Sequence, residues 1–185
     1  DKTIAVVVPA YNEETQIKMV IDSMPDYVDR IVIVNDASKD DTLKIVKNSI
    51  DTDNQDYTNT QIKDEPIVSN RYNEADVFVE NLARNEAFTR AEIVNTNPDS
   101  DRIILVNHLD NGGVGAAIAS GYKWCREHKI DCTAVMAGDG QMDPDELWDI
   151  CTPVIEEGID YVKGNRLSHR SAKYLIPKTR YLGNS

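Results

Sequence analysis

Ala134-Val135-Met136-Ala137-Gly138-Asp139-Gly140-Gln141-Met142-Asp143-Pro144-Asp145-Glu146 is the stretch that decides the fold. Its apolar beginning predicts a buried strand, which breaks at the Gly-Asp-Gly-Gln turn. A helix start follows at once, with Asp143 as N-cap, Pro144 at the first helical position and Glu146 completing a capping box. Ligands bind at the carboxyl ends of the strands in an open α/β sheet. The stretch therefore predicts that Asp139 lies at the ligand-binding edge of such a sheet.

The turn also offers oxygen ligands for a metal ion. The carboxylate of Asp139 and the side-chain carbonyl of Gln141 suit Mg²⁺ or Mn²⁺ that carries substrate phosphates. The alternative is an ordinary strand-to-helix turn, in which Asp139 only shapes the backbone. Taken alone, the stretch supports the two interpretations equally.

An earlier unit follows the same pattern of strand, polar loop and helix. Residues 4–8 are a continuous apolar, β-branched run, typical of a strand that is buried on both faces. The polar loop 9–14 follows the run. Apolar residues then recur at helical spacing, at Ile17, Val20, Ile21 and Met24.

A second unit places Asp36 where the strand of residues 31–34 ends. Ser38, with Asp41 three residues later, predicts the cap of the following helix. An acidic residue at this point can accept hydrogen bonds from a ribose or a base. Equally, Asp36 can form an Asx-turn that caps the next helix, so both interpretations stay open.

Residues 51–101 interrupt this regularity. They are rich in Asp, Asn and Thr, and only a weak apolar stripe suggests a helix over residues 73–90. About fifty residues without a clean period is too long for an ordinary loop. We interpret residues 51–101 as an insertion with some structure of its own.

The strand pattern returns at residues 102–106, followed by the glycine-rich turn 111–115. The helix after it is expected to bury Gly121 in tight packing against the sheet. The turn matches neither a dinucleotide fingerprint nor a P-loop. The side chains expected on the buried face of this helix are those of Val114, Ile118, Tyr122 and Cys125.

The C-terminal part should contain a helix over residues 144–157, which Pro153 bends or shortens, and a short strand over residues 159–164. Beyond it, cationic side chains collect in an otherwise acidic protein. Such a segment would suit a diphosphate ligand beside a metal site, or an anionic membrane surface. The cationic residues are Arg166, His169, Arg170, Lys173, Lys178 and Arg180.

Composition narrows the function classes. The chain has 185 residues, 41% of them hydrophobic and 28% charged, with a formal net charge of −12. This charge argues against binding nucleic acid through its phosphates, but a polyphosphate held by a metal ion remains compatible. Cys125, Cys132 and Cys151 lack CxxC spacing, so we interpret them as reduced core residues of a cytosolic chain. No apolar run approaches the roughly 18 residues of a spanning helix.

Five blocks of the sequence, in register and in order, resemble the family 2 glycosyltransferases. The strongest likeness is to the branch that includes dolichyl-phosphate mannosyltransferase and related polyprenyl-phosphate glycosyltransferases. It implies one α/β catalytic domain over residues 1–185 with the glycosyltransferase-A fold, a mostly parallel central sheet with helices on both faces. Residues 166–185 would begin a membrane-proximal segment. The blocks are residues 7–13, 34–40, 111–117, 139–144 and 163–166.

The resemblance also implies a nucleotide-sugar donor, either a UDP-sugar or a GDP-sugar, and a divalent cation. Asp139 and Gln141 would bind Mg²⁺ or Mn²⁺, and Asp139 and Arg166 would act directly in catalysis. The sequence departs from the family at Ala137, where many members have a second aspartate. The predicted donor site consists of Pro9, Tyr11, Glu13, Asp36, Gly112, Asp139, Arg166 and Arg180.

The implied reaction is an inverting, metal-dependent transfer of the sugar to an acceptor. A polyprenyl or dolichyl phosphate is preferred, because its oxygen is already ionised and needs no general base. Alternatives are transfer to a saccharide hydroxyl, and a scaffold or sensor that binds nucleotide sugar without turnover. We expect the cytoplasmic face of a membrane, contacted through the C-terminal side, and no nucleic-acid partner. The sequence leaves the oligomeric state open.

Overall fold

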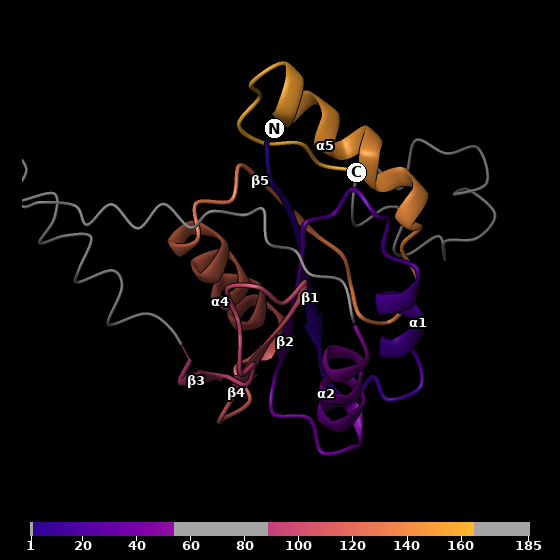
Figure 1. Cartoon of the computed structure of the whole chain (residues 1–185), viewed down its shortest axis with the longest axis vertical. Helices are drawn as coiled ribbons and strands as arrows, with labels where there is room; N and C mark the ends of the chain where they lie inside the picture. The colour runs from indigo at the N-terminus through magenta and orange to yellow at the C-terminus, as the bar shows by residue number, and fades with distance from the viewer. Residues whose placement is uncertain (1, 54–88, 165–185) are drawn as a thin grey trace, which may run out of the picture.

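A computed structural model of the chain describes residues 2–53 and 89–164 (Figure 1). Most of the helix expected over residues 73–90 lies outside the described residues. So do Arg166, Arg180 and the whole segment 166–185.

A five-stranded sheet in the order β3-β4-β2-β1-β5 forms the centre of the molecule. Four neighbouring strands are parallel, and only β3 runs antiparallel, at the edge beside β4. β3 comes from the described end of the segment 51–101, so this part of the predicted insertion belongs to the sheet. The strands are β1 (Ile4–Ala10), β2 (Arg30–Asn35), β3 (Ala91–Ile93), β4 (Ile103–His108) and β5 (Cys132–Val135).

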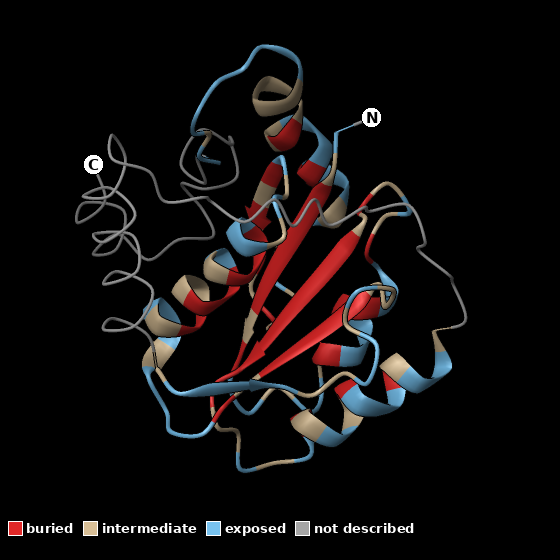
Figure 2. Ribbon diagram, turned by 60° about the vertical axis from the view of Figure 1, so that its left-hand side comes forward, coloured by how far each residue is buried: buried red, intermediate tan, exposed pale blue. Residues whose placement is uncertain are grey.

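Helices cover both faces of the sheet, and β1, β2 and β4 are almost entirely buried between them, whereas the edge strand β3 is exposed (Figure 2). Along β1, Val6 and Val8 pack toward one group of helices and Ala5 and Val7 toward the other face, so the strand is apolar throughout. The prediction of a mostly parallel sheet with helices on both faces is confirmed. Within the described ranges, no helix is long and apolar enough to cross a membrane. On the first face lie α1 (Ile17–Asp22), α2 (Thr42–Thr52) and α5 (Leu147–Glu156), and on the second α4 (Gly113–Glu127).

The packing of α4 confirms one prediction and corrects another. A Cβ atom at Gly121 would collide with the side chain of Val7, so the glycine does allow a tight approach to the sheet. The expected apolar face was partly wrong, because Val114 and Tyr122 are 68% and 45% exposed. The close approach turns the small side chains toward the sheet instead. The buried residues of α4 are Ala117, Ser120, Gly121, Trp124 and Cys125.

The helix after β5 begins as predicted, with Asp143 accepting a hydrogen bond from the Asp145 N–H at 3.0 Å. A 3-10 turn, Pro144–Glu146, precedes α5, which contains Pro153 and ends soon after it. The strand expected over residues 159–164 is wrong. The chain leaves α5 through a turn in which the Ile159 N–H binds the Pro153 carbonyl, and the residues that follow are irregular.

Candidate functional site

The order in which the chain adds strands to the sheet reverses next to β1, because β2 and then β4 lie on one side of it and β5 lies on the other. In open α/β sheets, ligands bind outside the carboxyl ends of the strands at such a switch point. Here the loop after β1 meets the loop after β5, because the Gly138 N–H donates to the Pro9 carbonyl at 3.3 Å. A Cβ atom at Gly138 would lie 3.1 Å from that carbonyl oxygen, so only glycine fits comfortably. The segment that carries Asp139 therefore lies against the end of β1.

Carboxylates from three loops gather at this switch point. Burial raises the pKa of Glu13, and the negative charges of Asp139 and Asp40 raise it further. Each of these charges acts on Glu13, so Asp139 and Asp40 each lie within electrostatic range of it. The structure thus brings together Glu13 and Asp139, which the sequence placed in one site.

The loops after β1 and β2 are held together by bonds from backbone N–H groups to side chains. The N–H groups of Asn12 and Glu13 donate to Ser38 Oγ at 3.0 Å and to Thr42 Oγ1 at 2.8 Å. In return, Asn12 Oδ1 accepts from the Lys39 N–H at 2.8 Å. We call this set of bonds between residues 12–14 and 38–42 the loop clamp.

A pair of carboxylates extends the loop clamp. Asp40 Oδ2 accepts from the Glu14 N–H, and Glu14 Oε2 accepts from the Asp41 N–H, both at 3.0 Å. Asp40 Oδ1 also accepts from the hydroxyl of Thr42 at 2.6 Å. The prediction that Ser38 caps α2 was wrong, because its hydroxyl serves the neighbouring loop instead.

Backbone strain accompanies these bonds. Asn12 and Ala37 have φ values of 57° and 56°, in the left-handed region. Asparagine tolerates this conformation, but alanine adopts it at a cost of about 1–2 kcal/mol. Ala37 lies between Asp36 and Ser38, whose hydrogen bonds hold both sides of it. Strain that is fixed in this way is concentrated at functional sites.

Among the predicted site residues that the structure describes, Asp36 has the largest number of side-chain hydrogen bonds. It is only 2% exposed, and its carboxylate accepts from the N–H groups of Gly112 at 2.8 Å and Gly113 at 2.7 Å. His108 Nδ1 lies 2.7 Å from Asp36 Oδ1. Burial alone would raise the pKa of Asp36, but the hydrogen bonds from Gly112, His108 and Gly113 lower it overall. Asp36 therefore does not cap the next helix, α2, but binds the N-terminus of α4.

The glycine-rich turn is shaped around this carboxylate. A Cβ atom at Gly112 would lie 2.5 Å from Thr89 Oγ1 and 2.7 Å from Ala116 Cβ. Gly113 has a φ of +82°, a conformation that other residues rarely adopt. The N–H groups of both glycines bind Asp36.

The turn after β5 is less constrained. Asp139 Oδ1 accepts from the Gln141 N–H at 3.1 Å, so Asp139 does shape the turn, and Gln141 is exposed. Within residues 2–53 and 89–164, no group of three His, Cys, Asp or Glu side chains could hold a metal ion. Mg²⁺ in proteins is commonly held by one or two carboxylates together with substrate phosphates. The oxygen donors of Asp139 and Gln141 fit a cation that the substrate helps to bind.

The remaining predicted residues frame the same edge. Pro9 lies in β1 opposite Val34, and Tyr11 is 44% exposed at the start of the loop. Sequence reasoning missed His108, although it lies two residues after the buried Val106, on the same face of β4 as α4. It also missed Thr42 as a partner of Glu13.

Comparison with known proteins agrees with the sequence blocks. Residues 5–63 match the family described as Glycosyl transferase family 2. The resemblance to the family 2 glycosyltransferases is confirmed. The matched glycosyltransferase segment contains β1, β2, the loop clamp and Asp36. The family match thus covers the loops after β1 and β2, which are joined by the loop clamp.

Two relatives match nearly the whole chain. A protein named UDP-N-acetylglucosamine–dolichyl-phosphate N-acetylglucosaminyltransferase, from Methanococcus voltae, is 29% identical over 185 residues, which are 100% of this chain and 60% of that protein. An uncharacterised protein of Methanocaldococcus jannaschii is 23% identical over 182 residues, 98% of this chain and 54% of its own. The chain therefore spans less than two thirds of either relative. A crystal structure of residues 1–349 of S. aureus TarS matches 84% of this chain and 33% of its own, with a TM-score of 0.47 and 16% identity.

Proposed function

We propose that the chain is the catalytic part of a glycosyltransferase that moves a sugar from a nucleotide-sugar donor to a polyprenyl or dolichyl phosphate. The observation that carries the proposal is the 29% identity, along the whole chain, to a protein named for a UDP-N-acetylglucosamine donor and a dolichyl-phosphate acceptor. The contact of the turn that carries Asp139 with the end of β1, which carries the loop with Glu13, supports it, because this edge is where a ligand would bind. UDP-N-acetylglucosamine is the donor to test first.

The proposed reaction breaks the bond between the anomeric carbon and the donor diphosphate. An oxygen of the acceptor phosphate attacks the opposite side of that carbon, which inverts its configuration. Negative charge develops on the leaving diphosphate, so the chief catalytic need is electrostatic. Mg²⁺ or Mn²⁺, held by Asp139 and Gln141, would supply Lewis-acid stabilisation of that charge when bound.

The protein's own groups have separate parts in this proposal. Tyr11, Glu13 and Asp36 orient the nucleotide, and Arg166 and Arg180 donate charge-assisted hydrogen bonds to the diphosphate. No general base is required, since the acceptor oxygen is ionised at neutral pH. The cationic residues between 166 and 180 are the part that we propose contacts the membrane carrying the lipid acceptor.

The test is transfer of labelled N-acetylglucosamine from its UDP donor to dolichyl phosphate, with Mg²⁺ or Mn²⁺ and with a chelator. GDP-mannose and UDP-glucose serve as competing donors, and unphosphorylated dolichol is the matched acceptor control. We expect a cation-dependent lipid product from dolichyl phosphate and none from dolichol. Donor binding is followed separately by thermal unfolding, because a ligand at a hundred times its dissociation constant adds about 2.7 kcal/mol of stability. Binding of a donor without any lipid product would favour the scaffold or sensor.

A further inference from the structure

His108 is a buried titratable side chain that the proposed reaction does not use. It ends β4, is 1% exposed and bridges two elements. Its Nδ1 lies 2.7 Å from Asp36 Oδ1, and its Nε2 lies 2.8 Å from the hydroxyl of Ser120 on α4. Ser120 is itself 7% exposed. Hydrogen bonds therefore link Ser120 on α4, through His108 at the end of β4, to Asp36 directly after β2.

The chemistry of Asp36 fixes the direction of one of these bonds. Its pKa is lowered, so the carboxylate is ionised at neutral pH and can only accept hydrogen bonds. His108 Nδ1 must then carry the hydrogen and donate it to Asp36. The ring nitrogen on the other side, Nε2, faces the Ser120 hydroxyl, which sets the plane of the ring.

The two carboxylate oxygens of Asp36 accept different numbers of hydrogen bonds. Among the residues that the structure describes, Asp36 Oδ1 has two donors, the Gly112 N–H and His108 Nδ1, whereas Oδ2 has one, the Gly113 N–H. A carboxylate offers about four acceptor positions, so Oδ2 keeps room for one more donor. A ribose hydroxyl or a base N–H is a donor of that kind. The His108 bond is the only one of these three that comes from a side chain.

We propose that His108 and Ser120 are positioning residues of the donor site, acting through Asp36. The inference rests on the proposed function, because it assigns these residues to nucleotide-sugar binding. His108 holds the Asp36 carboxylate in one orientation, in which Oδ2 has an acceptor position left for the donor, and Ser120 holds His108. A purely structural role would lower stability without selectively weakening donor binding.

The test compares four variants of the protein in the transfer reaction with UDP-N-acetylglucosamine, together with calorimetric binding of UDP. His108→Leu removes both bonds, and we expect KM for the donor and Kd for UDP to rise about tenfold while kcat changes little. His108→Asn keeps a donor near the Nδ1 position and should recover most of the affinity. Ser120→Ala should weaken binding about two- to threefold.

His128→Asn is the matched control at the opposite end of α4. His128 also uses its Nδ1, which lies 2.7 Å from the Trp124 carbonyl, and its ring stacks on that of Trp124. We expect unchanged donor KM in this variant, whatever its melting temperature.

The outcomes separate the two proposals. If the wild type transfers the sugar and His108→Leu has the same donor KM as the wild type, the positioning role is overturned and the proposed function stands. Equal weakening in His108→Asn and His108→Leu also overturns it, because the retained donor would then be irrelevant. If His108→Leu does not fold, His108→Asn and Ser120→Ala decide by the same criterion. No nucleotide binding and no turnover by the wild type would overturn the proposed function, and the positioning role with it.

Discussion

The two sides of the switch point are built differently. On the side of β1 and β2, the loop clamp joins residues 12–14 to residues 38–42 by bonds that cross from one loop to the other. On the side of β5, the bonds of Asp139 and Asp143 stay within the turn, and Gly138 provides a link to β1. The first side is therefore fixed by bonds between two loops, whereas among the described residues the carboxylate of Asp139 is bonded only within its own turn. Changes on the first side should affect stability and binding together, and changes at Asp139 should affect donor binding and turnover with little effect on stability.

The largest expected effect is at Asp139. Asp139→Ala should lower kcat/KM at least about a hundredfold, because the cation would lose its charged ligand. Its melting temperature without ligand should stay within about 2 °C of the wild type, since within residues 2–53 and 89–164 the carboxylate loses one bond, that to the Gln141 N–H. Steady-state kinetics and thermal unfolding of the same preparation check both statements.

Asp143→Ala is the control from the same turn. Asp143 caps the Pro144–Glu146 turn, so its loss should cost about 1 kcal/mol of stability and leave turnover unchanged. If Asp139→Ala lost as much stability as Asp143→Ala, the proposed contrast between the two sides would be contradicted.

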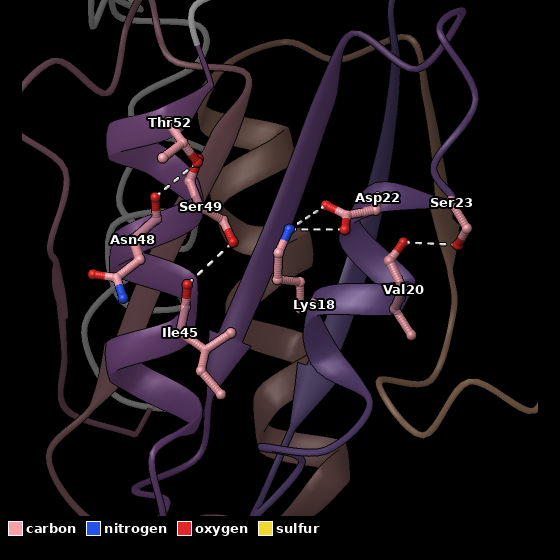
Figure 3. A network of polar contacts seen from close by, with 8 residues as sticks. All are labelled: Lys18, Val20, Asp22, Ser23, Ile45, Asn48, Ser49 and Thr52. Carbon is pink, nitrogen blue, oxygen red and sulfur yellow. Dashed lines mark hydrogen bonds and ion pairs between the residues drawn. The ribbon is translucent and has the colours of Figure 1, made fainter.

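At Asp36 the main effect should be on stability. Asp36→Asn should lower the free energy of unfolding by about 3 kcal/mol. An asparagine cannot accept from both glycine N–H groups and from His108 at once, because its Nδ2 is a donor. Asp22→Asn is the surface control. Asp22 pairs with Lys18 at 2.7 Å on the exposed side of α1 (Figure 3), so its loss should cost under about 1 kcal/mol.

The pH dependence of this difference has a definite sign. The pKa of Asp36 is lowered from 3.8 in the folded protein, so its stabilisation is fully present above pH 3.8 and is lost as the pH falls through the lower folded value. The unfolding free energies of the wild type and Asp36→Asn should therefore converge in acid. Urea titrations at pH 7 and at decreasing acid pH measure the gap, and a gap that widens in acid would refute the assignment.

Thr42 tests the loop clamp with a smaller change. Thr42→Val keeps the shape of the side chain but removes the bonds to the Glu13 N–H and to Asp40 Oδ1. We expect a loss of about 1–2 kcal/mol in stability and a few-fold weaker donor binding. Thr52→Val is the matched control, because Thr52 bonds only within α2, to the carbonyls of Asn48 and Ser49 (Figure 3). It should change stability by under about 0.5 kcal/mol and leave donor binding as it is.

The sequence predicts the local features of the fold better than the features that depend on contacts between distant residues. The strands of β1, β2 and β4 could be predicted, because continuous β-branched runs bury both faces whatever lies beside them. The face of α4 could not, since Val114 and Tyr122 have the spacing of a buried stripe. The contact of Gly121 with Val7, from a strand more than a hundred residues earlier, decides which face is buried.

The site shows the same division. Asp36 and Asp139 could be located at strand ends from the pattern alone. The partners of Asp36 could not be assigned, because Gly112 and His108 lie more than seventy residues away and meet it only through the order of the strands. Ser38 was assigned to the nearer helix for a similar reason: local capping rules favour neighbours in sequence, whereas the hydroxyl serves the loop after β1.

Glu13 is where the two sides meet, and its replacement should stabilise the folded protein slightly at neutral pH. Its pKa is raised above 4.5 by burial and by the charges of Asp139 and Asp40, so the ionised folded form is disfavoured. The contribution of Glu13 to stability is then full below pH 4.5 and is lost as the pH rises through the folded value. Glu13→Gln should accordingly raise the melting temperature at pH 7 by about 1–3 °C and leave it nearly unchanged at pH 4. The same variant should gain less stability than the wild type from UDP with Mn²⁺, because the repulsion that a cation would relieve is gone. Thermal unfolding at both pH values, with and without ligand, measures the two effects, and a lower melting temperature at pH 7 would show that the Glu13 carboxylate stabilises the folded site instead.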